Sequence, residues 1–376
     1  MKRLFGVSAV AVMLGIASST DARAVEIERN AGAVFVMTNS AEGNQVLAYV
    51  RAADGKLEQR FKYYTGGRGS GGLIDPLESQ GSLTLSEDHS LLFAVNAGSG
   101  TLAVFRVHGP RLFLIDVVHS GGSEPNAVAQ RGDLVYVLNT GGSSGVTGFR
   151  LREGGRLERI ANSQRFLSTN TSGAASLSFS PDGRFLVVSE RLTNSIDTFK
   201  VQEDGTLSPI VLNHDAAPGT FSVAFAPNGT ALVTETGPEG VQNGSTISSY
   251  GVQEDGTLFP ISIEVPTLGA ATCWHVVTPD GRFVYTDNAG TSNISGFFLN
   301  GDGTLTPLPH TIQAANPDGS TNLDMAITAN GKFLYTLNAR TGRIGIFAVN
   351  ESGALANIGS VNAVDPNAGA NGIASF

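Results

Sequence analysis

The sequence of 376 residues has little charge, few aromatic side chains and a single cysteine. Charged residues make up 15% of the chain and aromatic residues 7%, whereas 41% of the residues are hydrophobic. Disordered chains combine high charge with few apolar groups, so this composition excludes disorder. The single Cys273 excludes an intramolecular disulfide and any metal site built from several cysteines. We expect its side chain to be a small buried hydrophobic group.

Positive charge is also scarce, because the chain has only five lysines and carries a net charge of −9. Nucleic-acid binding needs a basic patch, and the scattered arginines form none, so we expect no nucleic-acid partner. No His, Asp or Glu cluster has metal-ligand spacing, and no Gly-x-Ser-x-Gly motif is present. The sequence therefore predicts neither a metal nor a cofactor.

The longest apolar run lies near the N-terminus, at residues 4–16, after Lys2 and Arg3. It is too short to cross a bilayer, which takes about 20 residues. An Ala-Arg-Ala cleavage signal follows at 22–24, so we predict that residues 1–24 are a secretory signal peptide. A short membrane anchor is the alternative. The mature protein is then exported to the periplasm or the extracellular space, without membrane insertion after signal removal.

Glycine is abundant, with 47 residues, and much of it lies in the turns of an internal repeat. Each copy has two short apolar stretches around a turn such as Pro-Asp-Gly. Asp-Gly and Asn-Gly pairs favour hairpins because the turn needs positive φ angles. The copies lie at residues 83–88, 131–137, 176–188, 222–229, 275–285 and 326–335.

After these two stretches, each repeat continues with a polar residue, a third strand that ends in an aromatic residue, a second tight turn and a fourth strand. The polar residues are 43 to 57 residues apart. Four strands in about 40–50 residues are typical of a propeller blade. We predict an all-β seven-bladed β-propeller of four-stranded antiparallel blades, as a single domain over residues 25–376. The polar residues are Asn39, Asn96, Asn139, Glu190, Glu235, Asn288 and Asn338.

The first repeat lacks its innermost strand, and residues 371–376 form a short strand-like segment with no turn after it. We predict that this C-terminal strand fills the missing place. Such pairing closes the ring and removes two free sheet edges.

The polar residues and the starts of the innermost strands share one face of the ring, here called the loop face. Long loops on a rigid scaffold often carry function, so we place the candidate site there. Glu190 and Glu235 hold equivalent positions in adjacent repeats and are predicted to act as general acid and base. Arg191 is predicted to stabilise an oxyanion. The alternative is that Glu and Asn alike satisfy the backbone amides at strand ends.

Further residues on this face are predicted to bind substrate. Trp274 is in the register that points toward the channel. His275 is in the apolar register, so a packed, hydrogen-bonded histidine is the alternative to a ligand-binding one. Arg340 would hold a carboxylate or an oxyanion. The predicted set is Asn139, Trp274, His275, Asp324 and Arg340.

The run at 180–188, with Asp-Gly-Thr-Leu at 204–207 and 255–258, resembles the lactonase family of seven-bladed propellers. That family includes bacterial 6-phosphogluconolactonases and fungal carboxy-muconate lactonising enzymes. Residues 284–288 are also similar to the Tyr-Val-Thr-Asn repeats of cell-surface propellers. The resemblance covers essentially the whole mature chain. It implies a site of His, Arg and Glu on the channel face, in which Glu235 and Glu190 match the glutamate that ends strand two.

These observations favour an exported lactonase-family protein that hydrolyses or forms a lactone of a small hydroxy acid. The alternative is a non-catalytic exported propeller that binds a protein or a glycan. A redox propeller with a quinone cofactor is less favoured, since Trp274 is the only tryptophan available to stack on it. We expect the protein to be a monomer.

Overall fold

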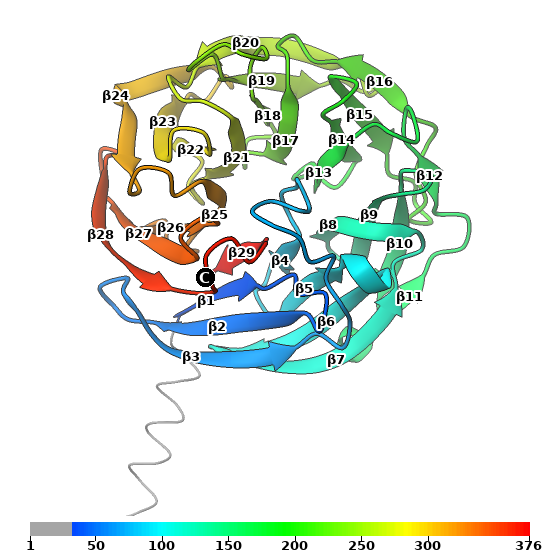
Figure 1. Cartoon of the computed structure of the whole chain (residues 1–376). Coiled ribbons are helices and arrows are strands. Elements are labelled where there is room, and N and C mark those ends of the chain that lie inside the picture. Colours follow the sequence, from blue (N-terminus) through cyan, green and yellow to red (C-terminus); the bar gives the residue numbers. More distant parts are fainter. Residues whose placement is uncertain (1–31) are drawn as a thin grey trace, which may run out of the picture.

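The computed structural model describes residues 32–376, in which seven antiparallel sheets are arranged in a ring (Figure 1). This arrangement confirms the predicted all-β seven-bladed propeller. The predicted signal peptide at residues 1–24 lies outside the described residues. Within residues 32–376, no helix is both long enough and apolar enough to cross a membrane.

Each blade runs from an innermost strand near the ring axis to an outermost strand at the rim (Figure 1). Blade one contains β1 (Gly32–Met37), β2 (Gln45–Arg51) and β3 (Leu57–Tyr64). Blade two contains β4 (Leu83–Leu85), β5 (Leu91–Asn96), β6 (Thr101–His108) and β7 (Arg111–His119). Blade three contains β8 (Ser123–Arg131), β9 (Leu134–Gly141), β10 (Gly145–Leu151) and β11 (Leu157–Arg159), with β12 (Arg165–Phe166) also paired to β10.

The remaining blades each have four strands. Blade four contains β13 (Ala174–Phe179), β14 (Phe185–Glu190), β15 (Ser195–Lys200) and β16 (Val211–His214). Blade five contains β17 (Thr220–Phe225), β18 (Ala231–Glu235), β19 (Thr246–Val252) and β20 (Leu258–Pro266). Blade six contains β21 (Thr272–Val277), β22 (Phe283–Asn288), β23 (Asn293–Leu299) and β24 (Leu305–Ala315), and blade seven contains β25 (Asn322–Ile327), β26 (Phe333–Asn338), β27 (Arg343–Val349) and β28 (Leu355–Asn362).

The second strand of each blade is buried on both faces because the neighbouring blades pack against it. All six residues of β14 are buried, for example. The tyrosines of these strands also link adjacent blades by hydrogen bonds to a turn glycine. Tyr136 donates to the carbonyl of Gly205 at 2.6 Å, and Tyr285 donates to that of Gly353 at 2.7 Å. The repeated tyrosine therefore fixes the position of the next blade.

The ring closes through β29 (Ile373–Ser375), which pairs antiparallel with β1 and completes blade one. Ile373 lies opposite Val36, and Ser375 lies opposite Val34. Backbone hydrogen bonds of 3.1 Å extend the pairing on both sides, from Met37 to Gly372 and from Phe376 to Ala33. The predicted role of the C-terminal strand is confirmed.

Residues 71–82, here called the cap segment, leave blade one and cross the loop face before they reach blade two (Figure 1). Ser79 donates to the carbonyl of Asn126 in blade three at 2.8 Å. The backbone amide of Gln80 donates to the carbonyl of Ala175 in blade four at 2.9 Å. The side-chain amide of Gln80 donates to the backbone carbonyl of His275 in blade six at 2.8 Å. The cap segment is thus tied to three blades.

Deletion of residues 372–376 should lower the melting temperature by about 10 °C, because it removes the β1 pairing and the buried Ile373 side chain. Calorimetry on the full chain and the deletion variant measures the change. As a control, Phe376→Ala removes one half-buried ring and should cost much less. An unchanged melting temperature in the deletion variant would contradict closure by β29.

Candidate active site

The ring axis holds a channel that is closed on the loop face and open on the opposite face. The first four residues of β17 and β21 are buried, whereas the last two of each are partly exposed. The cap segment covers the buried ends. The sequence favoured a site on the loop face, but the accessible part of the channel opens beside the turns between strands one and two.

Two adjoining cavities of 540 and 430 Å³ make up this channel. They share the lining residues Gln80, Gly81, Thr84, Glu87, Ala224 and Phe225. The smaller part is also lined by His275, Asp324 and Ser375, which come from blade six, blade seven and the closing strand. A histidine, a carboxyl group and a hydroxyl group therefore border one cavity.

Asp324 lies at a β-bulge near the start of β25, where it has a φ of 62°. Asp tolerates this left-handed conformation better than most residues, and bulges re-aim side chains beside active sites. Its carboxylate accepts hydrogen bonds from the amides of Met325 at 2.9 Å and Ile373 at 3.2 Å. Burial nevertheless raises the pKa of Asp324 to about 7, because a charged carboxylate is poorly solvated there.

The cap segment brings a second carboxyl group, Asp75, close to this region. The Asn371 side chain donates to Asp75 at 2.7 Å, and burial raises the pKa of Asp75 to about 6. The negative charge of Asp75 also contributes to the raised pKa of Asp324. Arg191 forms an ion pair with Glu78 of the cap segment. The structure thus places Arg191 against the cap segment, and its predicted oxyanion role stays a prediction.

The tautomer of His275 follows from a count of hydroxyl hydrogens. Thr234 donates its one hydroxyl hydrogen to the carbonyl of Cys273, so Ser222 must donate in its 2.7 Å bond to Thr234. The 2.7 Å bond between Ser222 and His275 is then donated by Nδ1 of the histidine. Burial lowers the pKa of His275 to about 4, so the ring is neutral and Nε2 carries a lone pair. Nε2 has no hydrogen-bond partner among the described residues.

Glu190 is fully buried and binds the segment that arrives from blade three. Its carboxylate accepts hydrogen bonds from Ser168 and from the Thr193 hydroxyl, the latter at 2.5 Å. Asp197 on the neighbouring strand shares this site. Burial, and then the hydrogen bond and charge of Glu190, raise the pKa of Asp197 to about 9. One carboxyl of this pair is therefore protonated at neutral pH.

Glu235 holds the equivalent place in blade five and is also fully buried. Thr246 donates to its carboxylate at 2.7 Å. Burial, and then the charge of Asp215, raise its pKa well above the ordinary value. Asp215 in turn accepts hydrogen bonds from Tyr250 at 2.6 Å and Thr220 at 2.7 Å.

The two glutamates thus belong to separate hydrogen-bonded groups and line neither part of the channel. Asn139 makes a similar link, because Ser120 of the preceding connection donates to it at 2.6 Å. Of these contacts, the one from the Ser168 amide to Glu190 is the backbone contact that the structural alternative predicts, and the others come from side-chain hydroxyls. The catalytic roles of Glu190 and Glu235 stay predictions.

The other sequence-predicted residues lie around the cap segment and on the loop face. The Trp274 indole is buried, donates to the carbonyl of Ser79 at 2.9 Å and contacts the Phe221 ring at a centroid distance of 4.9 Å. Arg340 is exposed on the loop face. Cys273 is buried, as expected.

Sequence reasoning missed Gln80, Ser222 and Ser375. Gln80 lies between two repeats, where no periodic pattern marks it. Ser375 lies in the predicted closing strand. Only the pairing register of that strand with β1 could have indicated that Ser375 lines the channel. Among residues 32–376, no group of three or more His, Cys, Asp or Glu side chains is arranged to hold a metal ion.

The fold and the channel define a seven-bladed propeller with a titratable group in its central cavity. The chain belongs to the lactonase family of seven-bladed β-propellers, which matches residues 132–274 and 275–370. No curated protein matches the sequence.

Solved structures share this fold at low sequence identity. A Bacteroides uniformis protein with a proposed 6-phosphogluconolactonase activity is 20% identical, with a TM-score of 0.68 over 92% of this chain and 100% of its own. The periplasmic gluconolactonase of Pseudomonas aeruginosa is 18% identical, with a TM-score of 0.68 over 92% of this chain and 99% of its own. A Lactobacillus plantarum protein is 18% identical, with a TM-score of 0.69 over the same shares of the two chains.

The raised pKa of Asp197 predicts a stability that depends on pH. This carboxyl ionises near 3.8 in an unfolded chain and at about 9 in the folded protein. Between these two pH values the folded state binds more protons than the unfolded state does. The free energy of unfolding therefore falls as the pH rises. Asp197→Asn removes this titration and keeps a hydrogen-bond donor for Glu190. The variant should therefore gain stability relative to the wild type as the pH rises.

Calorimetry of both proteins at about pH 5 and about pH 8.5 tests this expectation. The difference in melting temperature, variant minus wild type, should be larger at the higher pH by about 2 °C or more. Asp197→Ala is the control, because it also removes the titration but leaves a cavity and should melt lower at both pH values. Equal pH dependence in wild type and Asp197→Asn would show that Asp197 is not protonated.

Proposed function

We propose that the protein hydrolyses a lactone of a small hydroxy acid in the central channel, with Asp324 as the general base. The observation that carries this proposal is a carboxyl group that lines the channel and has a pKa of about 7. A general base is most effective when its pKa lies near the working pH. Membership of the lactonase family supports the same class of reaction.

In this reaction, the ionised Asp324 carboxylate takes a proton from a water molecule as the oxygen of that water attacks the lactone carbonyl carbon. The Ser375 hydroxyl is buried in the lining of the same cavity and has no partner among the described residues, so a rotation of this side chain toward the cavity lets it donate to the developing oxyanion. The ring C–O bond then breaks, and the proton held by Asp324 passes to the leaving alkoxide. The product is the open hydroxy acid.

The fixed positions of the groups around Asp324 contribute to this chemistry. Asp324 is held by two backbone amides and a buried strand, so its position needs little reorganisation during the reaction. The neutral Nε2 of His275 is an acceptor rather than a positive charge, and it therefore does not lower the pKa of Asp324. Electrostatic stabilisation by preorganised groups often contributes most of the rate enhancement of an enzyme.

Export is part of the proposal, because residues 1–24 have the pattern of a secretory signal peptide. A fold neighbour is a periplasmic gluconolactonase. Aldonolactones outside the cytoplasm are therefore suitable first substrates to test.

A second candidate function is non-catalytic binding of a protein partner on the loop face. Leu73, Leu192 and Val241 are all exposed there, in the cap segment and in two loops that follow strand two. Contiguous exposed apolar patches often mark protein contacts, and we propose that these three side chains belong to one such patch. A well-folded protein that hydrolyses no lactone would favour this function.

Asp324→Asn should reduce kcat for lactone hydrolysis by about a hundredfold or more, because the amide cannot accept a proton. The substitution keeps the residue size and tolerates the left-handed backbone. Acid release from D-glucono-1,5-lactone and a panel of other small lactones measures the rate, after subtraction of spontaneous hydrolysis. Glu235→Gln is the matched control and should retain activity within a few-fold. A large loss of activity in Glu235→Gln, with activity retained in Asp324→Asn, would indicate that the general base lies on the loop face instead.

The pH dependence of kcat/KM should follow the ionisation of Asp324. The base works only as a carboxylate, so the rate should rise with pH and level off above a midpoint near 7. Enzymatic rates between about pH 5 and 8.5 give this profile. A flat or falling profile in that range would contradict the assignment of Asp324 as the base.

A further inference from the structure

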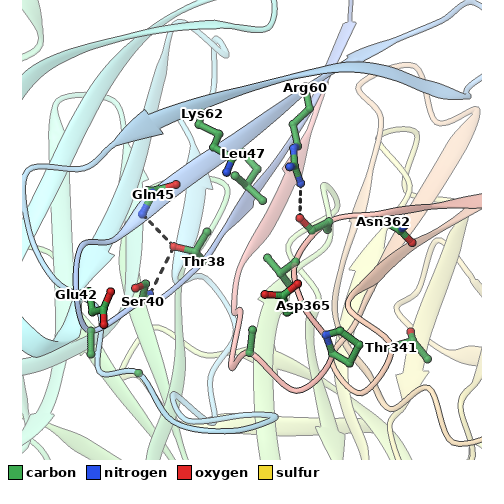
Figure 2. Close-up of a pocket in the computed structure, with 16 residues that line it drawn as sticks. Thr38, Ser40, Glu42, Gln45, Leu47, Arg60, Lys62, Thr341, Asn362 and Asp365 are labelled. Atoms are coloured by element: carbon green, nitrogen blue, oxygen red, sulfur yellow. Dashed lines mark hydrogen bonds between the residues drawn. The ribbon is translucent and has the colours of Figure 1, made fainter.

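A groove crosses the seam where blade seven meets blade one (Figure 2). Its volume of 750 Å³ exceeds that of either part of the channel. Residues 38–47 and 60–62 of blade one form one side, and residues 362–368, which lead to β29, form the other. We call this feature the seam groove.

Two cationic side chains lie on one side of the seam groove. Arg60 and Lys62 are two residues apart on β3, so they point to the same face of the strand. Arg60 donates to the carbonyl of Ala363 at 2.5 Å, which fixes its guanidinium at the edge of the groove (Figure 2). Lys62 is exposed and has no ion pair with any described residue.

Two carboxylates, Glu42 and Asp365, also line the seam groove and lie below the cations in Figure 2. Neither carboxylate has an ion pair within residues 32–376. Some surface charges elsewhere do pair, such as Arg150 with Asp133 at 2.9 Å. The groove therefore presents positive and negative groups that do not neutralise each other.

This arrangement favours a ligand that carries both charges. A polyanion would be repelled by a protein of net charge −9. None of the sixteen lining residues is aromatic, so a quaternary ammonium ligand would lack the aromatic cage that it needs. Charge-assisted hydrogen bonds at both ends of a small ligand give affinity and orientation.

We propose that the seam groove binds a small zwitterion of the amino-acid class. Its carboxylate faces Lys62 and Arg60, and its ammonium group faces Glu42 and Asp365. Leu47, Val364 and Pro366 supply apolar lining for an aliphatic side chain. This proposal does not depend on lactone hydrolysis, because the groove lies apart from Asp324 and the channel.

The bound zwitterion contacts both ends of the closed ring. A ligand that binds only the folded state stabilises it by mass action, so binding should raise the melting temperature.

Isothermal titration and calorimetry of the full chain with L-leucine test this proposal. Two probes serve as controls: 4-methylpentanoate lacks only the ammonium group, and 3-methylbutylamine lacks only the carboxylate. L-leucine should bind at least tenfold more tightly than either probe and should raise the melting temperature. Absence of L-leucine binding, or equal binding of a singly charged probe, would overturn the proposal.

Charge variants separate the two ends of the groove. Lys62→Gln and Asp365→Asn should each weaken L-leucine binding at least tenfold and leave the melting temperature of the free protein unchanged. Lys200→Gln and Asp318→Asn, both outside the groove, should bind L-leucine as the wild type does. Equal loss in the control variants would show that binding reflects net charge rather than the groove.

Discussion

The pairing of β29 with β1 is the constraint on which the rest of the structure depends. Without this pairing, β1 and β29 would each present an unpaired edge to the other, and the pairing satisfies both edges. The same segment also reaches the interior. The Ile373 amide binds Asp324, Asn371 binds Asp75, and Ser375 lines the channel. Ring closure therefore assembles the candidate active site and, on the outside, the seam groove.

Burial in the ring raises the pKa of the candidate base and of several carboxyl groups with structural contacts. Asp197, Glu235 and Asp324 are all held away from water, and each has a raised pKa. Asp197 and Glu235 are enclosed between blades, with partners that hold the incoming connection in place. Asp324 alone of these three borders a cavity that opens to solvent. A raised pKa thus indicates chemistry only where a substrate can reach the group.

The sequence predicted the fold because turn chemistry and strand alternation recur in every repeat, and the missing strand of blade one indicated closure by residues 371–376. The candidate site was less predictable. The sequence placed Glu190 and Glu235 correctly at the ends of β14 and β18, but strand position does not reveal that connecting segments cover both side chains. The path of the cap segment could not be predicted, since residues 71–82 belong to no repeat and their partners are distant in sequence.

We therefore assign the proposed chemistry to the open channel of a lactonase-family propeller rather than to its loop face. A crystal structure of the Asp324→Asn variant soaked with D-gluconate, the product of one proposed substrate, tests this assignment most directly. We expect gluconate to lie in the channel, with its carboxylate within hydrogen-bond distance of residue 324 and the Ser375 hydroxyl. Gluconate bound at Glu190 or Glu235 on the loop face, with the channel empty, would contradict it.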